Sequence, residues 1–165
     1  MAGVRPQLRH LAQVVTEFLQ RVISGGQTGV DQTALLVARK LDIPTGGTAP
    51  KGWRTDEGPA PWLADYGLVQ STSAGYSART AKNVYDSCGT VLFGIMESRG
   101  CALTIGLCGH YDRPYLIDPG CASALNDWLD ANMIKILNVA GNRRLTNPQA
   151  AIACREVLEL VLLPF

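Results

Sequence analysis

Residues 21–41 read RVISGGQTGVDQTALLVARKL, and this stretch decides the fold. Its first four residues are a strand-like run that ends abruptly at the glycine-rich turn of residues 25–29. Apolar side chains then recur at helical spacing, at Ala34, Leu35, Val37, Ala38 and Leu41. A strand, a glycine turn and a helix in this order are the opening unit of an α/β fold.

The same alternation continues to the end of the chain. Strands are predicted over residues 66–69, 89–94, 114–118 and 134–140, and helices over residues 77–86, 101–108, 122–133 and 148–163. Residues 45–61 are rich in glycine and proline and predict a long loop, which inside a compact domain is usually functional. The alternation predicts a single-domain, Rossmann-like α/β fold with a mostly parallel sheet and helices on both faces.

The N-terminal segment has apolar residues at helical spacing, at Leu8, Leu11, Val15, Phe18 and Leu19. We therefore expect an amphipathic helix over residues 1–20, followed by one ligand-binding domain over residues 21–165. A chain of 165 residues buries enough surface for a full core without disulfide or metal staples. No segment approaches the roughly 20 apolar residues of a membrane span, so we expect no membrane association.

The charge balance and the cysteines limit which binding partners and which cellular compartment we expect. There are 15 Lys and Arg residues against 14 Asp and Glu residues, so the chain has no global basic field for non-specific nucleic-acid binding. The five cysteines are widely spread and show no metal-ligand spacing. A reducing compartment fits this pattern best, so we expect a cytoplasmic protein without a nucleic-acid partner.

Ligands of open α/β sheets bind at the carboxyl ends of the strands, which singles out the strand-to-helix loops. The first of these loops is the glycine turn, which consists of Gly25, Gly26, Gln27, Thr28 and Gly29. Its glycines would let backbone N–H groups approach a phosphate at a helix start. The alternative is a tight turn capped by Asp31 or Thr28. Its place after the first strand favours anion binding.

Two further candidate segments contain cationic side chains. Lys51 and Arg54 flank Trp53 in the predicted long loop and can be presented to a ligand, although a solvated loop with Trp53 packed beneath it is equally consistent. Arg79 and Asn83 lie four residues apart, and therefore on one face of the predicted helix. Such a charged face is usually only the solvent-exposed side.

The strand at residues 89–94 runs into another candidate anion site, made of Ser98, Arg99, Gly100 and Thr104. These residues sit where a second helix start can hold an anion. Residues 138–144 also run from a strand into a polar loop, which could line the same crevice or form a turn with exposed arginines. The two histidines have no metal-ligand partners and no nucleophile motif is present, so the chain has the profile of a binding module.

Six motifs, taken in order, resemble the molybdenum cofactor carrier family. They are VISGGQTGVD at 22–31, PTGG at 44–47, APKGWR at 49–54, YGL at 66–68, RTxxNV at 79–84 and LNVAG at 137–141. The match covers roughly residues 21–160. The family is similar in fold to the cytokinin-activating phosphoribohydrolases, also called lysine decarboxylase-like proteins. The resemblance implies a homo-oligomer that binds molybdenum cofactor, a pterin with a phosphate and a dithiolene-held molybdenum, and protects or delivers it without chemical conversion.

The resemblance also suggests roles for the candidate residues. The phosphate would meet either the glycine turn or the segment from Ser98 to Thr104, with Arg99 and Cys101 as departures from the family pattern. Lys51, Arg54, Arg79 and Asn83 would supply charge and hydrogen bonds to the remaining oxygens and the pterin edge.

Two alternatives remain open. One is a nucleoside-monophosphate phosphoribohydrolase, and the other is a nucleotide-sensing module. The related phosphoribohydrolases use the glutamate of a Gly-Thr-x-x-Glu segment, but this chain has Thr104 or Leu107 at that place, so we expect no enzyme activity.

The last predicted helix suggests self-association. It carries apolar residues around most of its circumference, at Val157, Leu158, Leu160, Val161, Leu162 and Leu163. One face of a sheet can cover such a helix only in part. We therefore expect a dimer or tetramer, with enzymes of molybdenum cofactor synthesis or use as further partners.

Overall fold

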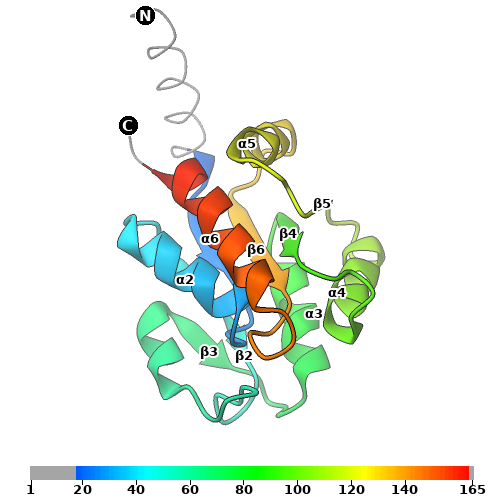
Figure 1. Ribbon diagram of the computed structural model, residues 1–165. Helices are drawn as coiled ribbons and strands as arrows, with labels where there is room; N and C mark the ends of the chain where they lie inside the picture. The colour runs from blue at the N-terminus through cyan, green and yellow to red at the C-terminus, as the bar shows by residue number, and fades with distance from the viewer. Residues whose placement is uncertain (1–17, 164–165) are drawn as a thin grey trace, which may run out of the picture.

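The computed structural model describes residues 18–163, which form one α/β domain (Figure 1). Its six strands are all parallel and lie in the order β3-β2-β1-β6-β4-β5. The strands are β1 (Arg21–Ile23), β2 (Thr45–Ala49), β3 (Leu68–Gln70), β4 (Gly89–Phe93), β5 (Tyr115–Ile117) and β6 (Ile136–Gly141). The predicted Rossmann-like fold is confirmed. Most of the expected N-terminal helix lies outside the described residues.

Helices cover both faces of the sheet. They are α2 (Val30–Lys40), α3 (Tyr76–Asp86), α4 (Arg99–His110), α5 (Ala122–Ala131) and α6 (Pro148–Leu162), with a 3-10 helix, η1, at Pro61–Tyr66. On one face α6 packs between α2 and α5, and on the other α3 packs against α4 (Figure 1). None of the helices in residues 18–163 combines the length and apolar character needed to cross a bilayer.

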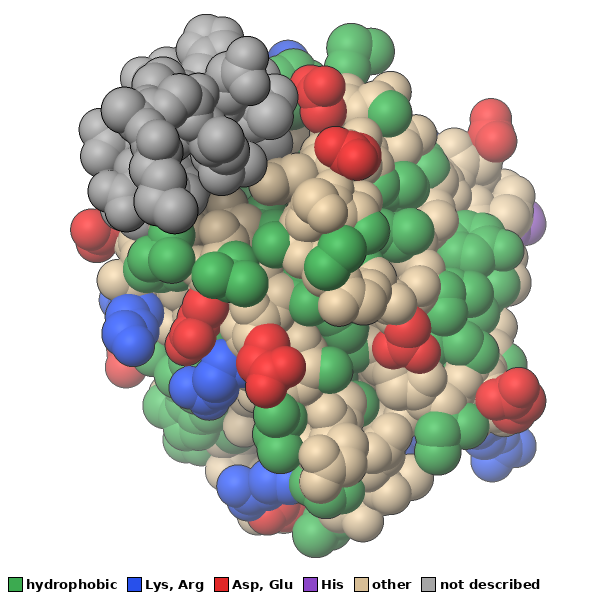
Figure 2. All heavy atoms as spheres, turned by 45° about the horizontal axis from the view of Figure 1, so that its top comes forward, with side chains coloured by type: hydrophobic (Ala, Val, Ile, Leu, Met, Phe, Trp, Pro, Cys, Tyr) green, Lys and Arg blue, Asp and Glu red, His purple; other side chains and the backbone are tan. Residues whose placement is uncertain are grey.

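The main core lies between the sheet and the layer of α2, α5 and α6. Its largest members include Phe93 from β4, Leu137 from β6 and Leu158 from α6, each no more than 1% exposed. Four of the six apolar side chains of the last predicted helix are buried, whereas Leu160 is 59% exposed and Leu163 is 39% exposed. On the surface shown in Figure 2, acidic and basic side chains are interspersed.

The prediction of one long loop over residues 45–61 is wrong, because its first five residues are β2. Two glycines inside this strand permit it to form. A Cβ at Gly46 would fall 1.9 Å from a guanidinium nitrogen of Arg21, and one at Gly47 would fall 2.1 Å from the carbonyl oxygen of Ser24. The glycines therefore allow close approach to β1 rather than marking a turn.

The strand order indicates where a ligand-binding site is expected. The last strand in the sequence, β6, lies in the middle of the sheet between β1 and β4. The chain leaves β1 towards one edge of the sheet and leaves β4 towards the other, so the order reverses around β6. A crevice outside the carboxyl ends of strands at such a switch point is where α/β proteins bind ligands.

Candidate functional site

The glycine turn after β1 satisfies its own backbone. The N–H of Gln27 donates to the Asp31 carboxylate over 3.2 Å, and that of Thr28 donates to the side-chain oxygen of Gln27 over 3.0 Å. Gly29 occupies the N-cap of α2. The Asp31 carboxylate therefore caps the turn, as the alternative interpretation expected, whereas Thr28 does not. These amides, which were predicted to approach a phosphate, are occupied by groups of the same chain.

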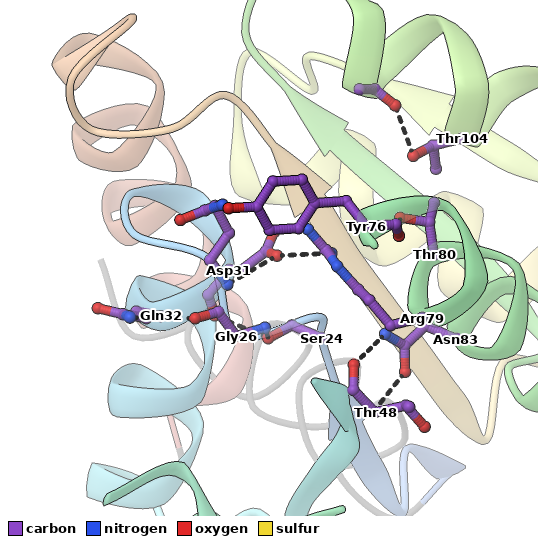
Figure 3. A network of polar contacts seen from close by, with 12 residues as sticks. Ser24, Gly26, Asp31, Gln32, Thr48, Tyr76, Arg79, Thr80, Asn83 and Thr104 are labelled. Atoms are coloured by element: carbon purple, nitrogen blue, oxygen red, sulfur yellow. Dashed lines mark hydrogen bonds and ion pairs between the residues drawn. The ribbon is translucent and has the colours of Figure 1, made fainter. Parts of the chain in front are cut away.

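Arg79 lies directly over this turn (Figure 3). Its side chain reaches from α3, and its Nη1 is 3.3 Å from the Asp31 carboxylate oxygen. A Cβ at Gly25 would fall 1.7 Å from the same nitrogen, so only glycine permits this approach. Burial raises the pKa of Asp31 above its ordinary value, and the guanidinium charge of Arg79 opposes part of this rise.

Tyr76, in the first turn of α3, gathers three arginines from three different segments. The guanidinium carbons of Arg54, Arg79 and Arg143 lie 5.2, 5.5 and 5.2 Å from the centroid of its ring. We call these four residues the Tyr76 cluster. It brings Arg54 from the loop after β2 together with Arg143 from the loop after β6, so it concentrates positive charge at the carboxyl ends of the strands.

Two consecutive ion pairs fasten the loop after β2 to the loop after β6. Arg143 donates to Asp56 over 3.0 Å, and the neighbouring Arg144 pairs with Glu57. The N–H of Asp56 also donates to the side-chain oxygen of Gln27, over 2.9 Å. The glycine turn, the loop after β2 and the loop after β6 therefore form one polar network.

Asn142 extends this network to α4. Its Oδ1 accepts from the N–H of Ile95 over 2.6 Å, and its Nδ2 donates to the Ser98 hydroxyl over 3.0 Å. Its own carbonyl accepts from the N–H of Val30, the first residue of α2. One residue with 4% exposure thus fixes the starts of α2 and α4 relative to each other.

The start of α4 is more open than that of α2. Ser98 is its N-cap and accepts from the N–H of Cys101 over 3.3 Å, while Arg99 and Gly100 are exposed. Within residues 18–163, no group is found to accept from the N–H of Arg99 or Gly100, as expected in the first turn of a helix. Thr104 is buried and its hydroxyl donates to the Gly100 carbonyl over 2.9 Å.

The remaining predicted residues differ in burial. Asn83 is buried, and its amide bonds both the N–H and the carbonyl of Thr48, so it holds α3 against β2 (Figure 3). Lys51 is exposed. On α3 the exposed-face interpretation fits Lys82, which pairs with Asp86, but not Arg79, which points inwards.

Several of these residues were not part of the site predicted from the sequence. Tyr76 carried no motif of its own, and Asp56 and Arg143 become partners only through contacts across 87 positions of the chain. The one available signal was that residues 138–144 run from a strand into a polar loop, which includes Asn142 and Arg143. Trp53 packs against the small apolar cluster around Leu63, as the alternative for its loop expected.

The carboxylates of the network are engaged in ion pairs. Asp31 pairs with Arg79 and Asp56 pairs with Arg143, so both are held by cations. In the part of the chain that the structure describes, no group of three or more His, Cys, Asp or Glu side chains is arranged to hold a metal ion. The arrangement can attract and bind an anion, and it presents hydrogen-bond donors more readily than a base.

Comparisons with known proteins show which family and which solved structures this chain resembles. The model of the circularly permutated YpsA SLOG family matches residues 22–162. Among solved structures, a putative molybdenum carrier protein from Syntrophus aciditrophicus SB is 37% identical with a TM-score of 0.81, over 87% of this chain and 95% of that chain. (E)-4-Hydroxy-3-methyl-but-2-enyl diphosphate reductase aligns at 11% identity and a TM-score of 0.38, over 94% of this chain and 65% of that one, which carries no conclusion. No curated protein matches.

Proposed function

Because this chain belongs to the circularly permutated YpsA SLOG family, we propose that its crevice binds molybdenum cofactor as cargo and holds it without chemical conversion. The similarity to a putative molybdenum carrier protein supports the choice of ligand. The observation that carries the proposal is the network at the carboxyl ends of β1, β6 and β4, which offers guanidinium groups and helix-start amides while its carboxylates are ion-paired.

The phosphate of the cofactor fits the start of α4 better than the glycine turn. At the turn, a carboxylate and a side-chain amide of the same chain already accept from the N–H groups of Gln27 and Thr28. At α4, Arg99 and Gly100 are exposed, and no acceptor is found for their N–H groups among the described residues, at the positive end of the helix. Arg99 adds a full charge at the same place.

The same residues support the absence of turnover. In the Gly-Thr-x-x-Glu segment of the related phosphoribohydrolases, the glutamate corresponds to Thr104 or Leu107 of α4, and neither has a carboxylate. Proton transfer also requires an acid or base that can reach the ligand. Asp31 is 3% exposed and lies beneath Arg79, so it does not meet this requirement.

We further propose that the carrier self-associates through the face of α2 and α6. Leu36 on α2 and Ile152 on α6 are 41% and 49% exposed and line one surface cavity of about 350 Å³, and Leu160 is exposed further along α6. Apolar side chains gathered in this way favour a protein interface. Light scattering on a dilute sample is expected to give a dimer or tetramer, and a monomer at all concentrations would contradict the proposal.

Cofactor binding is best tested by purifying the protein anaerobically from a host that makes molybdenum cofactor. We expect bound molybdenum and oxidised pterin in equal amounts with the wild-type protein, and a loss of both with Arg54→Ala. Arg39→Ala is the matched control, because Arg39 also lies over a tyrosine ring, 4.3 Å from the centroid of Tyr66, but on the last turn of α2.

The alternatives have distinct readouts in the same preparation. Neither molybdenum nor pterin in the wild-type protein, even after incubation with free cofactor, would overturn the carrier function. Release of ribose phosphate from AMP would establish a phosphoribohydrolase instead. Tighter saturable binding of a nucleotide than of pterin would establish a nucleotide sensor.

A further inference from the structure

We propose that the Tyr76 cluster is a second anion subsite, which takes a tetrahedral oxyanion of the phosphate or molybdate class. This inference deepens the proposed function and rests on it for the identity of the complete ligand. It assigns the crevice two anion subsites, one at the start of α4 and one at the Tyr76 cluster. The matching ligand carries negative charge at two separated ends.

The first support is an excess of positive charge. Of the three arginines around the Tyr76 ring, Arg79 pairs with Asp31 and Arg143 pairs with Asp56. Among residues 18–163, no carboxylate lies within ion-pair distance of Arg54. Three guanidinium groups within 5.5 Å of one ring centroid repel one another, and an anion that bridges them relieves this repulsion.

The second support is a buried donor without an acceptor. Gln27 is 4% exposed, and its Oε1 accepts from the N–H groups of both Thr28 and Asp56. These two bonds fix the amide so that its Nε2 points away from them, and this nitrogen has no hydrogen-bond partner within the described residues. The buried Nε of Arg79 is likewise unpartnered. Buried donors are normally satisfied, so two in one network indicate an absent acceptor.

The chemistry of these groups selects the ligand class. Guanidinium and amide N–H groups are donors only, so the ligand must present acceptor oxygens. The three guanidinium groups come from separate segments and meet at one ring, so we expect a compact tetrahedral oxyanion to reach them better than a planar carboxylate does. The ring of Tyr76 supplies a partly buried face on which the guanidinium groups rest.

Two consecutive residues connect the subsites. Asn142 donates to Ser98, the N-cap of α4, and Arg143 lies against Tyr76. β4, which precedes α4, and β1, which precedes the glycine turn, are separated only by β6, so their ends lie about 10 Å apart. A ligand with a phosphate at one end and an oxygen-bearing metal group at the other can span this gap.

Titration calorimetry with inorganic phosphate and with molybdate tests the subsite without the cofactor. We expect both ions to bind the wild-type protein, and Arg54→Ala to weaken binding about 10-fold, the loss of one charge-assisted hydrogen bond. Arg54→Lys is expected to recover part of the lost oxyanion affinity. Arg39→Ala is expected to bind as the wild type does, because it removes a cation from a tyrosine ring outside the cluster.

Arg54 is exposed and makes no described ion pair, so its variants are expected to fold, and a circular dichroism melt checks this. Equal oxyanion affinity for the wild type and Arg54→Ala, or no binding at all, would overturn the subsite even if the cofactor is retained. Loss of oxyanion binding in Arg54→Ala alone would support the subsite even if the protein holds no cofactor. The two proposals therefore fail separately.

Discussion

The helices α2 and α4 both begin at the carboxyl end of a strand beside β6, yet they use their first turns in opposite ways. At α2, the turn amides bond to Asp31 and Gln27, and Arg79 covers Gly25. At α4, one serine cap leaves the adjacent N–H groups exposed. The glycine-rich turn therefore organises the side chains of the crevice, whereas the plainer helix start faces the solvent from which a ligand arrives.

The largest effect is expected from Gly29→Ala. Gly29 has φ +88°, and a Cβ there would lie 2.5 Å from the backbone oxygen of Asn142 and 2.6 Å from the backbone nitrogen of Arg144. Neither backbone atom can move without disturbing β6, so we expect a loss of about 3 kcal/mol or more in the free energy of unfolding. Urea denaturation measures it, and an unchanged midpoint would show that α2 is not pinned to β6.

Asn142→Ala should have the next largest effect, because it removes the link between the two helix starts. The N–H of Ile95 loses its acceptor and the Ser98 hydroxyl loses its donor. Leaving these partly buried groups without a partner costs about 1–2 kcal/mol in the free energy of unfolding. The control is Asn147→Ala, which removes only a donor to Asn142 from a half-buried position. Equal losses for both variants would contradict the bridging role.

A smaller, pH-dependent effect is expected from Asp31→Asn. Burial raises the pKa of Asp31 above its ordinary value of 3.8, so the folded state binds more protons than the unfolded state above about pH 4. The stability of the wild type therefore falls as pH rises through that range, and a neutral asparagine removes this dependence.

The measurement is urea denaturation of both proteins between pH 4 and pH 7. As pH increases, the free energy of unfolding of Asp31→Asn is expected to rise relative to that of the wild type. A gain in the opposite direction would mean that the charge of Arg79 outweighs burial and lowers the pKa of Asp31.

The sequence predicted the architecture well because its signals were local. The run from Arg21 into the glycine turn and α2, and the buried strand β4, each carry their periodicity within a few residues. The match to the SLOG family and the similarity to a putative molybdenum carrier protein confirmed the family resemblance. β2 was missed because its glycines serve contacts with Arg21 and Ser24, which lie more than 20 positions away.

The site was predicted less completely for the same reason. Arg79 and Gly25 are both in the predicted set, but only the structure shows that one lies on the other. The pairing of Asp56 with Arg143, and the place of both beside Tyr76, depends on loops that follow β2 and β6. No periodicity or spacing within one segment records such a contact, so the Tyr76 cluster emerges only from the topology.

The smallest effect on stability, and the sharpest contrast with Gly29, is expected at the other helix start. A Cβ at Gly100 meets no atom within 4 Å, and the residue lies in the first turn of α4. Gly100→Ala is therefore expected to change the free energy of unfolding by no more than about 0.5 kcal/mol, towards greater stability. The added methyl group would nevertheless stand beside the exposed N–H groups that we assign to the phosphate.

Gly100→Ala should thus separate folding from binding. We expect the variant to melt like the wild type, to retain less pterin after anaerobic purification, and to bind free molybdate at the Tyr76 cluster unchanged. Arg54→Ala should give the complementary result, in which molybdate binding weakens about 10-fold and the melt is preserved. If Gly100→Ala retains the cofactor in full, the phosphate does not lie at the start of α4, and the glycine turn beneath Arg79 becomes the place to look for it.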